Sequence, residues 1–236
     1  MAKKKIVGDM NTVERTAGTV FFIVYLLVLP LLAEKLFSIG ALLLGTSVSE
    51  STENIIYYYT LFAVTVLLFH SFLGKTWKKF MDRLGTCCGT VVTGMLLFYG
   101  ANELLYRVSH VLWGGQTNLN DVVIAAQVNS APRVTALIVL FLAPFVEEVL
   151  FRGLVFGCLR EHSRMVAYIV SCALFAFMHV WTFVLSSWDL SYFVLMLQYL
   201  VPGLVFAWCF EHSGSLWTSI AVHAAVNSLA FWTIIR

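Results

Sequence analysis

Side chains of the kinds that catalyse hydrolysis occur at three places inside long apolar stretches of this chain. They are Glu147-Glu148 with Arg152, Phe175 with His179, and His223 with Asn227. On insertion scales, a charged side chain at the centre of a membrane helix costs about 2.5–3.5 kcal/mol. A sequence that keeps carboxylates, a guanidinium and imidazoles at such depth is therefore expected to pair these groups and to use them in chemistry.

The first of these places carries two adjacent carboxylates. On a helix, Glu148 and Arg152 are one turn apart and share a face, so Glu148 can neutralise Arg152 within its own helix. Glu147 lies about 100° around the helix axis, and that pair leaves it without a cation. A carboxylate of this kind in a medium of low dielectric is suited to act as a general base or acid near neutral pH. The alternative is a salt bridge for helix packing that involves both glutamates.

The other two places add imidazoles and a carboxamide. Phe175 and His179 are one turn apart, as are His223 and Asn227, so each pair shares a helical face. A lone histidine on an apolar helix is more often a core residue, and a His-Asn pair alone equally fits contacts between membrane helices. His223 and Asn227 are also suitable as two hydrogen-bond donors to an oxyanion. The conjunction of three such helices favours a buried hydrolytic site.

Composition places the chain among membrane proteins with several spans. The 236 residues are 60% hydrophobic and 12% charged, whereas soluble domains carry about 25% charged residues. Apolar runs of about 20 residues predict helical spans, and therefore an all-α helix bundle. The formal net charge is +2 without a basic stripe, so we expect no nucleic-acid partner. The five cysteines lie in or beside apolar runs, without the spacing of a zinc site or a disulfide framework.

About seven stretches are long and apolar enough to cross a bilayer. They run over 18–37, 55–72, 87–106, 134–158, 166–185, 192–210 and 216–235. The sixth is expected to kink near Pro202-Gly203, and the connection over 108–133 is expected to be an external loop or a lid. We treat residues 1–236 as a single integral membrane domain with a motif-bearing catalytic core over 134–236.

Charges in the connections predict the orientation of the spans. Lysine and arginine gather before the first span, between the second and third, and between the fourth and fifth. The other connections carry acidic residues, with Arg133 as the main exception. Since loops rich in lysine and arginine stay in the cytoplasm, the N-terminus is predicted to be cytoplasmic. We expect a multi-pass protein of a cell membrane, in contact with the lipid bilayer.

The pattern E-E-x-x-x-R, then F-x-x-x-H, then H-x-x-x-N, each on a separate span, resembles the CPBP family. That family groups CAAX prenyl endopeptidases of the Rce type with bacterial bacteriocin-processing and immunity proteins, also called the Abi family. The resemblance covers 134–236, and the stretch 147–153 is similar to the bacterial branch in particular. The host membrane is accordingly expected to be a bacterial plasma membrane.

The resemblance implies a metal-independent glutamate peptidase inside the membrane, without a cofactor. Glu147 would activate a water with help from His179, and His223 and Asn227 would stabilise the tetrahedral oxyanion. The supporting residues would be Glu148, Arg152 and Phe175. The family's site opens toward the cytoplasm, and the predicted orientation puts the inner ends of the three motif-bearing spans there.

Three alternatives stay open. Glu147, His179 and His223 form a two-His, one-carboxylate set of the kind that catalytic zinc sites use, although the H-E-x-x-H helix is absent. A transporter or proton relay would also keep such groups in the membrane, with Glu103, Arg107 and Gln198 extending its path. The third alternative is a non-catalytic immunity or peptide-binding protein.

The sequence does not indicate which substrate the protein cleaves or what its oligomeric state is. A membrane-associated peptide or protein is the expected partner of a buried peptidase. A leader or signalling peptide, a bacteriocin-type peptide and a CAAX-like substrate are all compatible with the chain.

Overall fold

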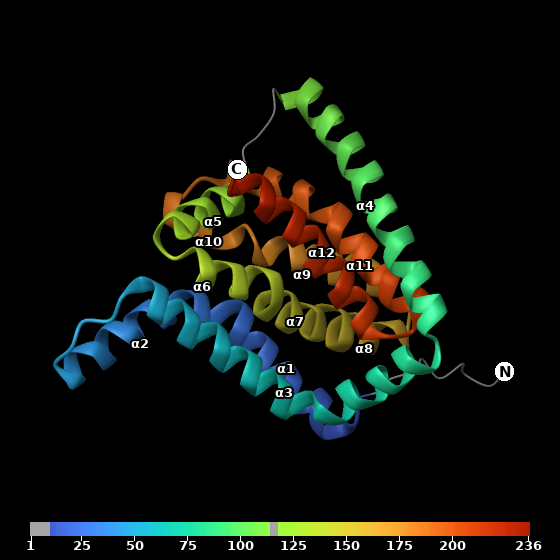
Figure 1. The fold of residues 1–236 in the computed structure, drawn as a ribbon, viewed down its shortest axis with the longest axis horizontal. Coiled ribbons are helices and arrows are strands. Elements are labelled where there is room, and N and C mark those ends of the chain that lie inside the picture. Colours follow the sequence, from blue (N-terminus) through green and yellow to red (C-terminus); the bar gives the residue numbers. More distant parts are fainter. Residues whose placement is uncertain (1–9, 114–117) are drawn as a thin grey trace.

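The protein folds as a bundle of helices. The computed structural model describes residues 10–113 and 118–236, and within them it contains no strand. Figure 1 shows the helices lying mostly along one direction, with α4 along one side of the bundle. The predicted all-α polytopic bundle is therefore confirmed.

The helices follow one another with short breaks. They are α1 Thr12–Ile23, α2 Leu29–Leu44, α3 Glu50–Asp82, α4 Leu84–Trp113, α5 Leu119–Ser130, α6 Pro132–Leu137, α7 Ala143–Glu147, α8 Gly157–Arg160, α9 Arg164–Met178, α10 Trp181–Ser187, α11 Leu200–Ser213 and α12 Leu216–Ile234. Wider π-helical turns join some of them, over Val24–Val28, Ile138–Leu142 and Glu148–Phe156, and a 3-10 helix over Leu190–Tyr199 leads into α11.

The seven predicted spans all correspond to helices. Among the described residues, five helical stretches are long and apolar enough to cross a membrane, and the bent pair α9 and α10, at 42°, would make a sixth. The five are Thr12–Leu44, Glu50–Asp82, Leu84–Val111, Pro132–Arg160 and Leu190–Ser213. The seventh predicted span is α12, a helix of 19 residues that carries His223 and Asn227 and is not among them.

The connection over 108–133, predicted as an external loop or a lid, is largely helical in the described residues. Helix α4 continues to Trp113, α5 follows from Leu119, and only 114–117 lie outside the described residues. Asn118 starts α5, because its side chain accepts hydrogen bonds from the N–H groups of Asn120 and Asp121. The polar residues that suggested a loop are thus a helix cap and one face of a short helix.

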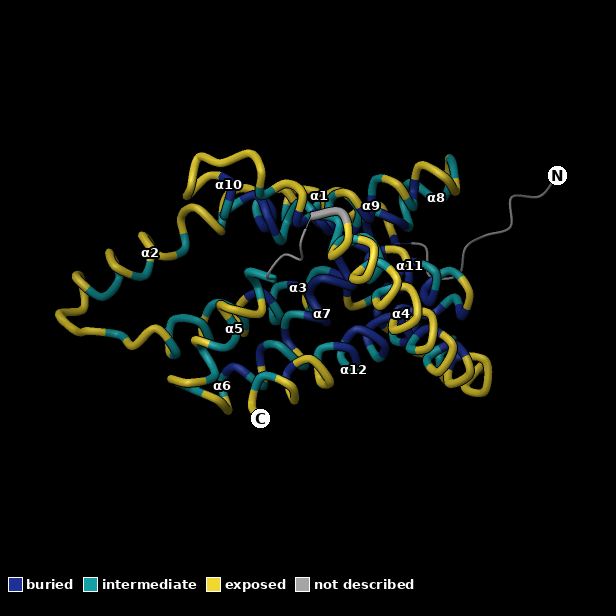
Figure 2. Tube along the Cα trace, turned by 90° about the horizontal axis from the view of Figure 1, so that it is seen from above, coloured by how far each residue is buried: buried dark blue, intermediate teal, exposed yellow. Residues whose placement is uncertain are grey.

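The two ends of the bundle differ in charge. The end near the N-terminus holds the ion pair between Arg15 and Glu161, and Arg160 and Arg164 both pair with Glu211. The tip of α2, helices α5 and α10, and the C-terminus gather at the opposite end (Figures 1 and 2). The basic connections therefore lie at one end, as the predicted orientation requires.

A buried carboxylate joins α1 to α3. Glu14 is 2% exposed. Its Oε2 accepts the N–H of Asn11, which caps α1, and its Oε1 accepts the N–H of Phe72 at 2.7 Å. The backbone of α3 is non-helical at Phe69, which interrupts the helical hydrogen bonds just before Phe72. Glu14 thus satisfies an N–H that the kink leaves without its usual partner.

We expect Glu14→Ala to destabilise the protein by about 1–3 kcal/mol, because the buried N–H of Phe72 loses its acceptor. Thermal unfolding of the purified protein in detergent measures this loss. Glu103→Ala is the matched control, since Glu103 sits on the exposed face of α4 and pairs only with Arg107. Equal melting temperatures for the two variants would contradict the role given to Glu14.

Candidate active site

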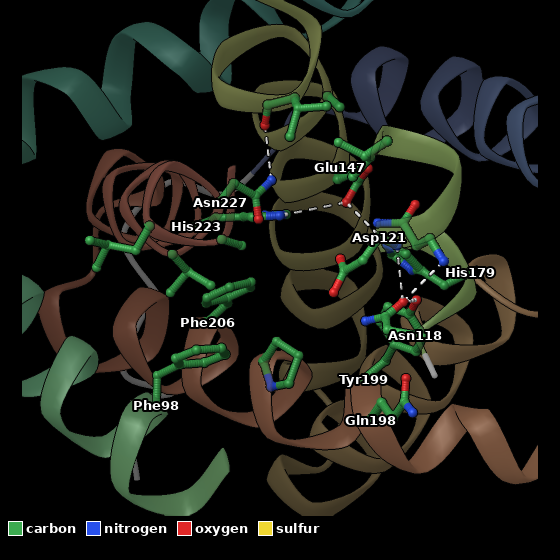
Figure 3. Close-up of a pocket in the computed structure, with 18 of the residues that line it drawn as sticks. Phe98, Asn118, Asp121, Glu147, His179, Gln198, Tyr199, Phe206, His223 and Asn227 are labelled. Carbon is green, nitrogen blue, oxygen red and sulfur yellow. Dashed lines mark hydrogen bonds and ion pairs between the residues drawn. The ribbon is translucent and has the colours of Figure 1, made fainter. Parts of the chain in front are cut away.

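Three helices bring one carboxylate and two imidazoles together. Glu147 lies at the end of α7, His179 follows α9, and His223 lies in α12. The Oε2 atom of Glu147 is 3.9 Å from His179 Nε2 and 3.9 Å from His223 Nε2 (Figure 3). Among the described residues this buried oxygen has no hydrogen-bond partner. The structure therefore brings these three predicted residues together.

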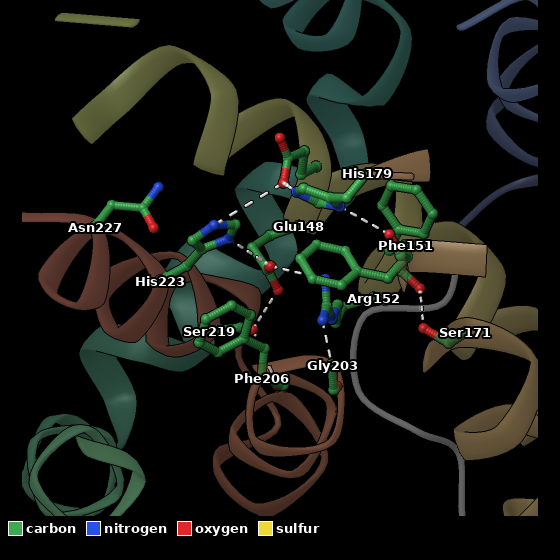
Figure 4. Close-up of polar contacts among 12 residues, drawn as sticks. Glu148, Phe151, Arg152, Ser171, His179, Gly203, Phe206, Ser219, His223 and Asn227 are labelled. Carbon is green, nitrogen blue, oxygen red and sulfur yellow. Dashed lines mark hydrogen bonds and ion pairs between the residues drawn. The ribbon is translucent and has the colours of Figure 1, made fainter. Parts of the chain in front are cut away.

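The neighbouring carboxylate, Glu148, is fully satisfied. Its Oε1 accepts hydrogen bonds from Arg152 Nη1 and His223 Nδ1, both at 2.9 Å, and its Oε2 accepts the hydroxyl of Ser219 at 2.5 Å (Figure 4). Glu148 and Arg152 are both 0% exposed. A buried ion pair is tolerated only when its geometry is good and its remaining groups are hydrogen-bonded. Both oxygens of Glu148 meet that condition, whereas Arg152 Nε has no hydrogen-bond partner among the described residues.

Arg152 is held by aromatic rings as well as by Glu148. Its guanidinium carbon lies 4.2 Å from the ring centre of Phe175 and 5.2 Å from that of Phe206, in cation–π contact. Its Nη2 also donates to the carbonyl of Gly203 at 3.3 Å. Phe175, predicted as a supporting residue, thus covers the guanidinium of Arg152 on one side. The centre of its ring lies 4.7 Å from that of the His179 ring.

Hydrogen bonding fixes which ring nitrogens carry hydrogen. His179 Nδ1 is 2.8 Å from the carbonyl oxygen of Phe175, and His223 Nδ1 is 2.9 Å from the carboxylate of Glu148. Both partners accept, so each Nδ1 must carry the hydrogen. In the neutral rings, the lone pair on each Nε2 therefore faces Glu147. Three acceptors converge on one point, an arrangement that suits binding a proton donor such as water.

Stacking holds both imidazole planes. The ring of His179 stacks on Tyr199 with 4.3 Å between centres, and that of His223 stacks on Phe206 with 4.5 Å. Tyr199 is held in turn, since its hydroxyl donates to Asn118 Oδ1 at 3.0 Å. Each imidazole is thus fixed by a hydrogen bond at Nδ1 and by a ring against its face.

Asn227 lines the same cavity but is engaged by the backbone. Its Nδ2 donates to the carbonyl of Val139 at 2.9 Å. Val139 lies in the π-helical turn, where each carbonyl bonds the N–H five residues on, and Pro144 at that position has no N–H. Asn227 therefore satisfies a carbonyl that proline leaves unpaired. Its amide nitrogen has two hydrogens, so the second is available to a ligand.

Sequence reasoning missed Ser219 and the aromatic supports. Ser219 donates to Glu148 and lies within hydrogen-bond distance of the carbonyl of Phe206, at 2.9 Å. It stands four residues before His223, so the face shared by His223 and Asn227 extends back to it. That spacing could have identified Ser219, whereas Tyr199 and Phe206 are two of many aromatic residues in apolar runs.

Two of the residues considered for a proton path do not reach the site. Glu103 and Arg107 pair with each other on an exposed face of α4. Gln198 does line the cavity beside Tyr199. In the part of the chain that is described, no group of three or more His, Cys, Asp or Glu side chains is arranged to hold a metal ion.

Two cavities meet at Glu147 and His179. One, of about 440 Å³, runs between α4, α5, α11 and α12 and also reaches His223 and Asn227. The other, of about 840 Å³, approaches from α2, α3 and α10. Tyr58, Asn120 and Gln127 line both cavities, so α5 lies across the place where they join.

The opening of these cavities differs from what the family resemblance implied. Their outer walls are formed by the first half of α2, the start of α3, and helices α5 and α10. These segments gather at the end of the bundle opposite the basic connections (Figure 2). The inner ends of the motif-bearing spans, which were expected to form the entrance, carry the ion pairs of Arg160 and Arg164 with Glu211.

Comparison with known proteins bears on this arrangement. Residues 129–229 match the family model for Rce1-like proteins, described as type II CAAX prenyl endopeptidase Rce1-like. No curated protein and no solved structure matches the chain. The matched stretch begins in α5 and ends in α12, and it contains every residue predicted for the site. This stretch, somewhat under half of the chain, is therefore similar to the Rce1-like CAAX prenyl endopeptidases of the CPBP family, and the match supports a peptide hydrolase of the membrane.

Proposed function

We propose that this protein is an intramembrane glutamate-type endopeptidase that uses Glu147 as its general base. The observation that carries the proposal is the position of Glu147 Oε2, buried and 3.9 Å from the Nε2 atoms of His179 and His223. A distance of 3.9 Å is too long for a direct hydrogen bond. It is short enough for one water to bridge the groups.

The attacking water would donate its two hydrogens to Glu147 and His179, since both present lone pairs. As its oxygen attacks the scissile carbonyl, Glu147 takes one proton and later passes it to the leaving amine. The peptide C–N bond breaks, and the products are a carboxylic acid and an amine. General-base assistance of this kind supplies about 10²–10⁴-fold in rate.

The oxyanion would be held by His223 and Asn227. Since His223 Nδ1–H is engaged by Glu148, its Nε2 can donate only when the ring is an imidazolium. The buried carboxylate of Glu148 accepts the Nδ1 hydrogen of His223 and fixes the orientation of the ring. We therefore assign Glu148 and Arg152 as positioning residues that act through His223, with Ser219 holding the second oxygen of Glu148.

Peptide profiles of cells test the proposed activity. Membrane and secreted peptides are compared between cells that carry the wild type and cells that carry Glu147→Gln at matched expression. We expect a cleaved peptide with the wild type alone, and its sequence would identify the substrate as a leader or signalling peptide, a bacteriocin-type peptide or a CAAX-like protein. Identical profiles with the natural substrate expressed would favour a transporter or a peptide-binding protein.

The zinc alternative uses the same three residues and is tested with purified protein. A glutamate mechanism without metal keeps its activity after exhaustive chelation. Activity that is lost on chelation and restored by zinc would instead assign Glu147, His179 and His223 as metal ligands. The expected location, a bacterial plasma membrane, is tested by fractionating the host cells.

Replacing Asn227 by alanine should lower kcat by about 10²–10³-fold with little change in KM, because an oxyanion donor acts in the transition state. The same change also leaves the carbonyl of Val139 unpaired. The control is Pro144→Ala, which supplies that carbonyl with an N–H of its own. In this background, Asn227→Ala should still lower kcat if Asn227 contacts the substrate. Recovery of activity in the double variant would show that its role is to hold the backbone.

A further inference from the structure

Side-chain amides gather along the two cavities that meet at Glu147. The structure describes nine asparagine and glutamine residues, and seven of them line one or both cavities. They come from α3, α4, α12, the 3-10 helix and the first residues and middle of α5, and they are Asn54, Asn102, Asn118, Asn120, Gln127, Gln198 and Asn227. Figure 3 shows three of them around the cavity that also holds His223. Amides are thus concentrated at the cavities of a chain that is 60% hydrophobic.

Three of these amides are not used by the fold. The side chains of Asn102, Asn120 and Gln127 are half-buried and make no hydrogen bond among the described residues. By contrast, Asn118 caps α5, and Asn227 supports a backbone carbonyl. Polar groups away from bulk water are normally hydrogen-bonded, so amides without a protein partner are expected to bind water or a ligand.

Two of the three lie where the cavities join. Asn120 and Gln127 each line both cavities, as Glu147 and His179 do. They are seven residues apart on α5, which is about two turns, so they share one face of the helix. Asn129 of the same helix is exposed and lines neither cavity. We call Asn120 and Gln127 the amide pair.

A peptide substrate needs new partners for its backbone at this site. In a helix each carbonyl is bonded to an N–H four residues on, so a water can attack a peptide carbonyl only where the helix has opened. The freed N–H and C=O groups then cost free energy unless they are paired again. The edge of a sheet often binds an extended peptide, but the described residues contain no strand. Side chains are therefore the available partners, and a carboxamide offers both donors and an acceptor.

The spacing of the amide pair fits an extended backbone. Seven residues of α-helix span about 10.5 Å. An extended chain covers that length with about three residues. Each carboxamide can donate to a peptide carbonyl and accept a peptide N–H at the same time. The pair can therefore hold the two ends of a stretch of about three residues.

We propose that Asn120 and Gln127 bind the main chain of the substrate and hold about three of its residues extended at the junction of the cavities. They are positioning residues, and the ligand they recognise is a peptide segment in extended conformation, selected by its backbone rather than by a particular side chain. The inference rests on the proposed peptidase function for its reference to a substrate. Binding does not depend on cleavage, so it can be tested separately.

A pair of probes tests whether the backbone is recognised. One is a fluorescein-labelled decapeptide of alanine and leucine, and the other is a depsipeptide with the same side chains, in which esters without an N–H replace the internal amides. The protein carries Glu147→Gln to prevent turnover and is placed in nanodiscs of neutral phosphatidylcholine, and binding to empty nanodiscs is subtracted. One hydrogen bond changes affinity by about two- to twelvefold. We expect Asn120→Leu/Gln127→Leu to weaken binding of the decapeptide by about tenfold and that of the depsipeptide by about threefold or less.

Asn129→Leu is the matched control, because it makes the same change on α5 outside both cavities. It should keep the binding of both probes within about twofold. All these variants should melt at the same temperature, since none of the three side chains makes a hydrogen bond among the described residues. Equal weakening for both probes, unchanged binding of the decapeptide, or no binding above that of empty nanodiscs would overturn the proposal and leave the amide pair to bind water only.

Kinetics separate a positioning role from a structural one. On the peptide identified in cells, Asn120→Leu/Gln127→Leu should raise KM by about tenfold and change kcat by less than about twofold, because contacts with the backbone are made in the ground state and the transition state alike. A lower kcat with an unchanged KM would overturn the proposal. Normal binding of the decapeptide by a protein that cleaves no peptide in cells would count against the peptidase function alone.

Discussion

Replacing Glu147 by glutamine should lower kcat for peptide hydrolysis by about 10²–10⁴-fold, because the amide cannot accept the proton of the attacking water. The substitution keeps the size of the side chain, and the buried Oε2 of Glu147 has no hydrogen-bond partner among the described residues. We therefore expect little change in KM or in thermal stability. Steady-state kinetics of the purified protein on the peptide identified in cells measure the effect.

Two further variants show whether the loss of kcat is specific to the catalytic site. Glu103→Gln removes a carboxylate from the exposed face of α4 and should keep full activity. Adding His179→Ala to Glu147→Gln should cause little further loss, because catalytic residues that act as a unit are not additive. A fully active Glu147→Gln variant would exclude Glu147 as the base.

Contacts between polar residues of one helix could be predicted from the sequence, whereas contacts between residues of different helices could not be derived from it. Spacing alone predicted that Glu148 neutralises Arg152, and the structure confirms this pair at 2.9 Å. Spacing also left Glu147 without a cation in its own helix. The convergence of Glu147 with His179 and His223 depends on how three helices pack, which helical periodicity does not specify. The conjunction of three such helices and the family resemblance suggested it beforehand.

Local backbone geometry explains part of what was missed. Residues Glu148–Phe156 form a π-helical stretch rather than the regular α-helix assumed for the motif. Wider turns of this kind occur often at functional sites, and apolar periodicity does not mark them. The engagement of Asn227 by Val139 depends on such a turn and on Pro144 together. This hydrogen bond therefore could not be predicted from the spacing of residues in the sequence.

The direction of the cavity also needed the packed structure. Charges in the connections predicted which end of the bundle is cytoplasmic, and the basic groups do gather at one end. They carry no information about where the helices separate. In the sequence, Glu50 and Glu53 belong to an acidic connection on the outer side. Only the packing of α3 shows that they line the same cavity as Glu147. The division into one domain with a core over 134–236 stays a prediction.

Replacing Arg152 by methionine should destabilise the protein by about 3–5 kcal/mol, because Glu148 would be left as a buried charge without its cation. Arg152 is 0% exposed and also supports the carbonyl of Gly203. Methionine fills much of the same volume between Phe175 and Phe206, so the lost charge rather than an empty cavity dominates the effect. Thermal unfolding in detergent, checked by denaturant titration, measures the change.

The double variant Glu148→Gln/Arg152→Met separates stability from catalysis. With both charges gone, the burial penalty largely disappears, and much of the lost stability should return. Activity should stay low, because His223 no longer has the carboxylate that accepts its Nδ1 hydrogen and orients its ring. If activity returned together with stability, the pair would serve the fold alone. If stability did not return, the guanidinium would be required for its contacts with Gly203 and the two phenylalanines. Recovery of the fold without the reaction is the result expected of a buried ion pair that positions a catalytic histidine.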